Sequence, residues 1–266
     1  MKHVFAIAGR ELSSLFVSPV AYVVLTLWAV LAGTFFLSSL IGFDQQLAQA
    51  SQYGAQEYLE RMNLNDHLIM PFYGSMWIVL LFLVPAVTMG LFANEKANGT
   101  DELLYTSPIG IWAIVVGKFL AGYVFVFIMT LIVAFFPGIL FVYGEPEIGK
   151  TLSGLLALLL VSVSYVSVGA LASSLTKNQL IAFVLTMVSL LVIGLMLPFI
   201  VEIGVGGDSG GGGIGIGPTM RYIATGTHFE TLVTGVVDTV DLVYFAVVMA
   251  VCMVLSKAAL ESVRWR

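Results

Sequence analysis

The sequence predicts an all-α polytopic membrane protein with six transmembrane helices, and three observations carry that prediction. Apolar residues make up 59% of the 266 residues and charged residues only 10%, whereas soluble domains contain about 25% charged residues. The mean hydropathy is +1.01. Six stretches are apolar over the roughly 20 residues that a helix needs to cross a bilayer. Because these stretches are continuously apolar and do not alternate, they indicate helices and not a barrel.

The composition also excludes several classes of function. A formal net charge of −5 leaves no basic surface for binding nucleic acid. The single cysteine, Cys252, excludes an intrachain disulfide and a cysteine-based zinc site. His3, His67 and His228 lie in three separate polar segments, so we expect no metal site, no catalytic residues and no cofactor bound by this chain.

Residues 1–18 are predicted to form a separate amphipathic helix that lies in the membrane interface. Apolar and polar residues separate onto two faces of a helical wheel, with Glu11 as the exception on the apolar face. Ser18-Pro19 ends this helix before the first span. The alternative interpretation is a frayed N-terminal tail.

The six spans form one transmembrane domain over residues 19–266. We expect them at residues 20–43, 69–93, 114–143, 152–175, 180–201 and 239–258. An even number of spans places both termini on the same side. If both are inside, the inner segments contain eight lysines and arginines and the outer segments only Arg61, Lys150 and Arg221. The positive-inside rule therefore predicts cytoplasmic termini.

The inner loop from Asn94 to about Ile111 is predicted to contain a short helix that contacts a soluble partner. Thr100 is a suitable N-cap for a helix whose first turn carries two acidic residues, and Pro108 closes the segment. The residues that we expect to make or support the contact are Glu95, Lys96, Gly99, Thr100, Asp101, Glu102, Leu103, Leu104 and Tyr105. The alternative is a connector without a partner.

The third outer loop combines a glycine tract with a short apolar segment. Four glycines at 210–213 favour a mobile chain. The segment that follows is apolar but too short to span, which predicts a re-entrant or interfacial helix. Its candidate residues are Tyr222, His228, Phe229 and Glu230. His228 and Glu230 could form an acid–base pair, but we favour anchoring of the segment among lipid headgroups. The last span begins at Asp238, and Asp241 also suits a helix N-terminus.

The stretch from Gly144 to Thr151 matches the phosphate-binding pattern G-x-x-x-x-G-K-[ST]. It joins two spans on the outer side, and Glu145 and Glu147 would repel a triphosphate. Pro146 also lacks an amide donor. We therefore interpret the match as a coincidence.

The fourth span is rich in small residues, from Ser162 to Ser173, with Gly169 and Ser173 at small-xxx-small spacing. This pattern favours close helix packing, although a polar path through the membrane remains an alternative.

Apart from groups at their edges, the predicted spans contain no Asp, Glu, Lys, Arg or His. Ion-coupled transporters usually keep such residues in the middle of the membrane, so this composition disfavours proton coupling. The chain also has no predicted ATP-binding domain. Energy for uphill movement would therefore come from a separate ATPase polypeptide.

Three stretches resemble the ABC-2 permeases, and in particular the branch of gliding-motility-associated permeases. They run from Gly9-Arg10-Glu11-Leu12 to Val24, from Glu95 through Gly99-Thr100-Asp101-Glu102-Leu103-Leu104 to Leu120, and from His228-Phe229-Glu230 to Arg266. The resemblance covers essentially the whole length, and only the glycine tract lies outside it. The middle stretch is shared by ABC-2 permeases broadly, whereas the first and last are typical of the branch.

The resemblance implies a permease subunit in a bacterial inner membrane, with an interfacial helix, a cytoplasmic coupling helix and a re-entrant hairpin. Its implied partners are a cytoplasmic ABC ATPase that binds ATP and magnesium, a second permease copy or paralogue, the lipid bilayer, and an auxiliary periplasmic protein. Residues 95–107 would carry the coupling role. The expected function is ATP-driven export of an unidentified substrate; the alternatives are a mechanotransmission scaffold and an autonomous channel or carrier.

Overall fold

The computed structural model describes residues 2–53, 62–100, 110–197, 199 and 222–264, and this part of the chain contains helices and no strand. The helices are α1 (Lys2–Val17), α2 (Pro19–Gln52), α4 (Met70–Thr88), α5 (Ala93–Ala97), α7 (Ile111–Tyr143), α8 (Ile148–Leu175), α9 (Gln179–Leu191), α12 (Thr225–Val233) and α13 (Thr239–Arg264). Two π-helical turns, η1 (Asn65–Ile69) and η2 (Val192–Met196), precede α4 and follow α9. The predicted all-α class is therefore confirmed.

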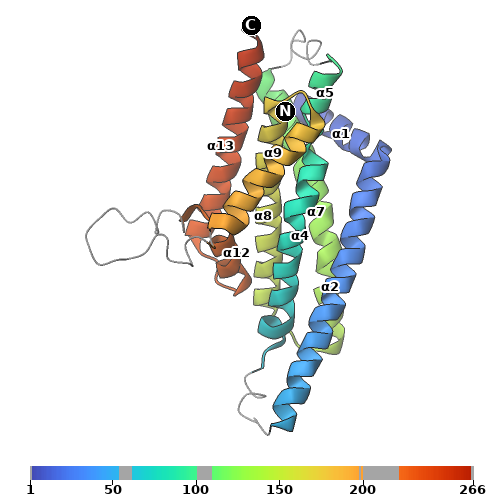
Figure 1. Ribbon diagram of the computed structural model, residues 1–266, viewed down its shortest axis with the longest axis vertical. Coiled ribbons are helices and arrows are strands. Elements are labelled where there is room, and N and C mark those ends of the chain that lie inside the picture. Colours follow the sequence, from blue (N-terminus) through green and yellow to red (C-terminus); the bar gives the residue numbers. More distant parts are fainter. Residues whose placement is uncertain (1, 54–61, 101–109, 198, 200–221, 265–266) are drawn as a thin grey trace, which may run out of the picture.

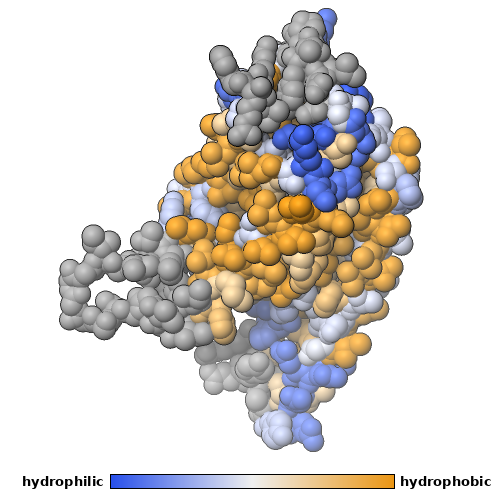
Figure 2. Space-filling model, turned by 45° about the horizontal axis from the view of Figure 1, so that its top comes forward, coloured by the Kyte–Doolittle hydropathy of each residue, from blue (hydrophilic) through white to orange (hydrophobic). Residues whose placement is uncertain are grey.

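Among the described residues, six helical segments are long and apolar enough to cross a membrane, in agreement with the number that the sequence predicts. They are Pro19–Gln52, Asn65–Ala97, Ile111–Tyr143, Ile148–Leu175, Gln179–Met196 and Thr239–Ser262. The first extends well beyond residue 43, because the polar stretch that follows continues the same helix. A broad apolar surface separates hydrophilic groups at the two ends of the molecule (Figure 2).

The helix α1 lies at an angle to the spans, at the end of the molecule where α5 and the last turns of α13 also lie (Figure 1). We call this end the α1 end. Ser18 separates α1 from α2, and its hydroxyl accepts a hydrogen bond from the Val20 amide at 3.3 Å. Pro19 occupies the first helical position of α2, where its missing amide proton costs nothing. The chain forms a helix here that ends before Ser18-Pro19, as the sequence predicts, and its location in the membrane interface stays a prediction.

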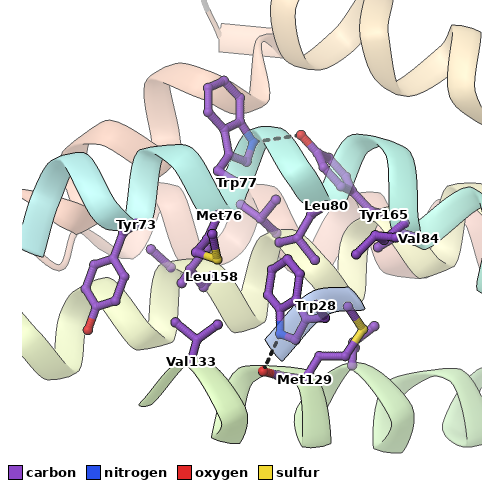
Figure 3. Close-up of a cluster of buried hydrophobic side chains, with 14 of the residues drawn as sticks. Trp28, Tyr73, Met76, Trp77, Leu80, Val84, Met129, Val133, Leu158 and Tyr165 are labelled. Carbon is purple, nitrogen blue, oxygen red and sulfur yellow. Dashed lines mark hydrogen bonds between the residues drawn. The ribbon is translucent and has the colours of Figure 1, made fainter. Parts of the chain in front are cut away.

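The centre of the bundle is α8, which packs against α4, α7, α9, α12 and α13. Two tryptophans form hydrogen bonds between spans (Figure 3). The Trp77 indole donates to the Tyr165 hydroxyl at 2.8 Å, and the Trp28 indole donates to the Met129 carbonyl at 2.8 Å. Each of these bonds joins two spans and satisfies a polar group that lipid could not.

The small residues of α8 allow this close packing. A Cβ atom on Gly169 would lie 2.1 Å from the Thr88 hydroxyl oxygen, and one on Gly154 would lie 2.3 Å from the ring of Tyr73. Both neighbours belong to α4. Packing is thus the role that the contacts support for this face of α8.

The segment around Gly144–Thr151 connects the two membrane-spanning helices α7 and α8 to η1. The Asn65 side chain accepts from the Glu147 amide at 2.8 Å and donates to the Thr151 hydroxyl at 3.1 Å. Lys150 pairs with Asp66 at 3.2 Å. These contacts give the backbone and lysine of the phosphate-loop pattern a structural role.

The helix α12 runs back along α8 toward the end of the molecule opposite α1. Its first turn lies beside α13, where the Thr225 and Tyr244 hydroxyls are 3.1 Å apart. Phe229 stacks on Trp77 with ring centroids 5.3 Å apart. Gly235, with a φ of 97°, then turns the chain against Lys150 at the start of α8. A short helix packed within the bundle and followed by this turn is compatible with the predicted re-entrant segment, which stays a prediction.

Candidate functional site: an ionic cluster between α1, α5 and α7

A buried lysine joins three helices at the α1 end. Lys118, in the second turn of α7, is 0% exposed. Its Nζ lies 3.2 Å from Glu11 Oε1 of α1 and 3.1 Å from Glu95 Oε2 of α5. It also donates to the Leu91 carbonyl at 2.6 Å. A buried lysine is tolerated when every proton of its ammonium group has a partner, and Lys118 has three.

A glycine allows α1 to approach α7 closely enough for this contact. A Cβ atom on Gly117 would lie 2.8 Å from Ile7 and 3.1 Å from the Val4 carbonyl oxygen. The absence of a side chain at this crossing lets the two helices touch. Glu11, one turn beyond Ile7, then faces Lys118.

Arg10 completes the cluster on its solvent side. Its guanidinium lies 2.6 Å from Glu11 Oε1 and 3.0 Å from Glu95 Oε1. The Arg10 side chain is 55% exposed, so its own pairs contribute little energy. The hydrogen bond to Glu11 raises the pKa of Arg10 above its ordinary value. Two carboxylates and two cations leave these four residues, which we call the inner ionic cluster, with no net charge.

The chain leaves helical geometry between α4 and α5, and α8 satisfies the backbone there. The Ser173 hydroxyl accepts from the amides of Phe92 and Ala93 at 3.0 Å each and donates to the Met89 carbonyl at 2.9 Å. The Lys96 ammonium group donates to the Ser174 carbonyl. The position of α5 is therefore set by α8 as well as by Lys118.

The helix α5 ends in a Schellman-type cap. Gly99 has a φ of 67°, which a residue without a side chain adopts easily. The Thr100 amide donates back to the Glu95 carbonyl at 3.0 Å. The predicted coupling segment from Asp101 onward follows this cap directly in the sequence.

A cavity of about 360 Å³ adjoins the cluster between α1, α2, α4 and α7. Its polar side carries the four cluster residues, and its apolar side is formed by residues such as Val24, Val87 and Phe125. Within the described parts of the chain, no group of three or more His, Cys, Asp or Glu side chains could hold a metal ion. What this geometry can do is transmit a displacement of α5 to α1 and α7.

Comparison with known families agrees with this architecture. The model of the ABC-2 family transporter proteins matches residues 5–263, nearly the whole chain. The chain belongs to the ABC-2 transporter family. Members of this family are generally non-catalytic membrane subunits of ABC transporters, and the family implies a partner ATPase. No curated protein matches the chain significantly.

The structure describes four of the nine residues that the sequence predicts for the coupling site, and one of them, Glu95, belongs to the inner ionic cluster. Glu95 and Lys96 are engaged within the chain, and Gly99 and Thr100 end α5. Asp101, Glu102, Leu103, Leu104 and Tyr105 lie outside the described residues. Contact with an ATPase stays a prediction for all nine residues.

The outer candidate residues are arranged differently from our expectation. His228 and Phe229 are buried, whereas Glu230 and Tyr222 are exposed. His228 pairs with Asp241 of α13 at 2.6 Å, and no bond between His228 and Glu230 is present. Its other ring nitrogen lies 2.8 Å from the Tyr222 carbonyl oxygen. The histidine thus holds α12 inside the protein by a hydrogen-bonded pair, because Asp241 projects from α13 toward it.

The sequence does not predict two ionisable pairs that the structure contains, Glu11 with Lys118 and His228 with Asp241. Glu11 was the exception on the apolar face of the first helix, and this exception was the available signal for a buried cation partner. The sequence indicates Asp241 only as a residue suited to a helix N-terminus. Nothing in the spacing of His228 and Asp241 indicates that they meet, because the turn at Gly235 brings them together.

Proposed function

We propose that this chain is the permease subunit of an ATP-driven transporter, coupling a separate cytoplasmic ATPase to movement of a substrate across the membrane. The observation that carries the proposal is the inner ionic cluster. Through Lys118 it joins the base of the predicted coupling segment to α1 and α7. A displacement of residues 100–107 by the ATPase would therefore move α1, the proposed interfacial helix, and α7, the third span, together.

The cluster is suited to rigid transmission because its central charge is buried. Ion pairs in water exchange partners readily and contribute about 0–1 kcal/mol. Breaking a pair in a buried site costs more, about 3–5 kcal/mol, because an uncompensated charge is left behind. Lys118 is 1% exposed at its side chain, so α1, α5 and α7 would move as one body.

The proposal extends to orientation and partners. We infer that the α1 end faces the cytoplasm of a bacterial inner membrane, since the lysine and arginine distribution favours it. A second permease copy or paralogue would complete the transporter, and a periplasmic protein would contact the opposite end. The gliding-motility branch is proposed from the resemblance of residues 9–24 and 228–266.

Charge reversal tests the coupling role directly. We expect Glu102→Arg to abolish co-purification of the partner ATPase or to uncouple its ATP hydrolysis from transport. Glu145→Arg, the same substitution in the loop before α8, is the matched control and should leave both unchanged. Equal behaviour of the two variants would contradict the proposal and favour an autonomous channel or carrier.

Transport by the purified complex separates the export function from the mechanotransmission scaffold. An exporter moves a lipid, glycan or peptide in step with ATP turnover, whereas a scaffold hydrolyses ATP and moves none of them. Accumulation driven by an ion gradient in liposomes that contain this chain alone would contradict both.

A further inference from the structure

The cavity of about 360 Å³ beside the inner ionic cluster has a charged end and an apolar end. On α2, Val24 lies six residues beyond Ser18, a step of about 9 Å at 1.5 Å per residue. On α7, Phe125 lies seven residues beyond Lys118, about 10 Å in the same direction. The lining therefore changes from charged to apolar along the axis of the spans, as a site for an amphiphile requires.

This cavity lies where a membrane lipid can reach it. The helix α1 packs against α7 and α2 but makes few contacts with α4, and the cavity fills the space between them. Val20 lines the cavity and is 47% exposed. Hydrophilic groups at the α1 end border the broad apolar surface (Figure 2). The charged end of the cavity is thus at the level of lipid headgroups, and the apolar end is at the level of acyl chains.

The charged end of the cavity is neutral as a whole. Arg10 and Lys118 balance Glu11 and Glu95, with distances of 2.6 to 3.2 Å between the paired atoms. A ligand with a net charge would leave that charge uncompensated in a site partly withdrawn from water. A ligand whose own charges sum to zero is therefore favoured.

Two groups of the cluster keep unused hydrogen-bonding capacity. Within the described residues, both bonds of Arg10 are made by Nη2, so its Nε and Nη1 have no acceptor. Both cationic partners of Glu11 bind Oε1, and Oε2 accepts from no group in the described part of the chain. Both residues line the cavity. The cavity thus presents a free donor for an anion and a free acceptor for a cation.

The side of the cavity formed by α1 and α2 suits a phosphate group. An arginine guanidinium matches two phosphate oxygens at once. The hydroxyl group of Ser14 adds a further donor on the same side of the cavity. Ser18, Val20 and Ala21, at the start of α2, also line it, and the positive end of the helix dipole favours a negative group there.

We propose that this cavity binds a zwitterionic phospholipid with a primary ammonium group, such as phosphatidylethanolamine, from the leaflet at the α1 end. The phosphate accepts hydrogen bonds from Arg10, and the ammonium group donates to Glu11 Oε2. An acyl chain contacts the apolar end at Val24, Val87 and Phe125. The site is formed by this chain alone, so it does not depend on the proposed coupling to an ATPase.

A series of headgroups tests the charge complementarity. The full chain in detergent is titrated with phosphatidylethanolamine, phosphatidylcholine and phosphatidylglycerol that carry the same acyl chains, and native mass spectrometry measures each dissociation constant. Phosphatidylcholine has no N–H group to donate, and phosphatidylglycerol has no cation. We expect each to bind at least about 10-fold more weakly than phosphatidylethanolamine. Equal affinity for the three lipids would overturn the proposal.

A soluble competitor distinguishes a lipid from a free headgroup. Phosphoethanolamine has the same two charged groups without acyl chains. We expect it to compete at least about 100-fold less well than the lipid, because it buries no apolar chain. Equal competition would assign the site to a soluble zwitterion and contradict a lipid site.

The acceptor for the ammonium group is tested by Glu11→Gln, which preserves the shape of the side chain but removes its charge. We expect the affinity for phosphatidylethanolamine to fall by about 10-fold and the affinity for phosphatidylglycerol not to fall, so that the preference is lost. The control is Glu261→Gln, which removes a carboxylate that pairs with Lys257 away from the cavity. This variant should keep the preference. An unchanged preference in Glu11→Gln would contradict the assigned role of Oε2.

A second pair of variants covers the case in which Glu11→Gln does not fold. Gly90 lines the cavity, whereas Gly138 of α7 does not, and a Cβ atom on either glycine would have no atom within 4 Å. Gly90→Phe takes up space in the cavity and should abolish the preferential binding of phosphatidylethanolamine. Gly138→Phe should leave it unchanged. The same preference in both variants would place the lipid elsewhere and overturn the proposal.

Discussion

At the scale of single residues, substitution of Lys118 is expected to have the largest effect on the free energy of unfolding. It is a charged group with 0% exposure, and its three partners come from α1, α5 and the turn after α4. Glu11 and Glu95 are themselves only 15% and 21% exposed at their side chains. Removing the lysine would leave two carboxylates that share the single guanidinium of Arg10, as well as an unpaired Leu91 carbonyl.

We therefore expect Lys118→Met to destabilise the protein by roughly 3–5 kcal/mol. Thermal unfolding in detergent measures the loss, and hydrogen exchange should show reduced protection of α1. Lys257→Met is the matched control, because Lys257 forms an i, i+4 pair with Glu261 at 2.9 Å on a partly exposed surface. That change should cost less than about 1 kcal/mol. Similar losses in the two variants would show that burial of Lys118 has no energetic role.

At the scale of elements, the position of α12 depends on a pair of side chains, His228 of α12 and Asp241 of α13. The carbonyl of Tyr222 can only accept, so the His228 nitrogen beside it carries a proton. The other ring nitrogen lies 2.6 Å from Asp241 Oδ1, within hydrogen-bonding distance. The ring of His228 also stacks on Tyr244, with centroids 4.1 Å apart. Asp241 Oδ2 is buried without a partner, so the bond to His228 is what compensates this carboxylate.

His228→Phe preserves the stacking on Tyr244 but removes both hydrogen bonds. We expect α12 to lose protection from hydrogen exchange by about 10-fold or more, because Asp241 would be buried unpaired. Glu230→Gln, an exposed position on the same helix, should leave the exchange rates unchanged. Unaltered protection in His228→Phe would mean that the apolar contacts of Phe229 and Leu232 alone hold the helix.

At the scale of the whole molecule, the two ends of the bundle carry different structural elements. The α1 end carries α1, α5 and the inner ionic cluster, and the opposite end carries the turn at Gly235 and the junction of α7 with α8 (Figure 1). A broad apolar surface lies between them (Figure 2). With six spans, the lysine and arginine distribution predicts that the α1 end is cytoplasmic.

Cysteine labelling checks this orientation. In a Cys252→Ala background, Ser13→Cys places a thiol on the exposed face of α1 and Thr234→Cys places one at the opposite end. With intact cells, an impermeant maleimide should label Thr234→Cys at once and Ser13→Cys only after permeabilisation. The reverse pattern would invert the topology and remove the basis for an ATPase contact at α5.

Local features of the sequence were enough to predict six spans, a separate helix before Ser18-Pro19, a break after the second span and a short helix before the last one. These features depend on local properties: apolar length, a proline that stops a helix, and a capping residue. The solvent around each span is lipid, so hydropathy along the chain is sufficient to find it.

The contacts between polar groups, in contrast, follow from the folded arrangement of the helices. Glu11 and Lys118 are more than 100 positions apart, and their contact requires the crossing at Gly117. His228 and Asp241 are close in sequence, yet they pair only because Gly235 reverses the chain. The identity of a residue does not show which distant residues will surround it in the folded chain. The free energy of burying a polar or charged side chain depends on those partners, so it cannot be read from the residue alone.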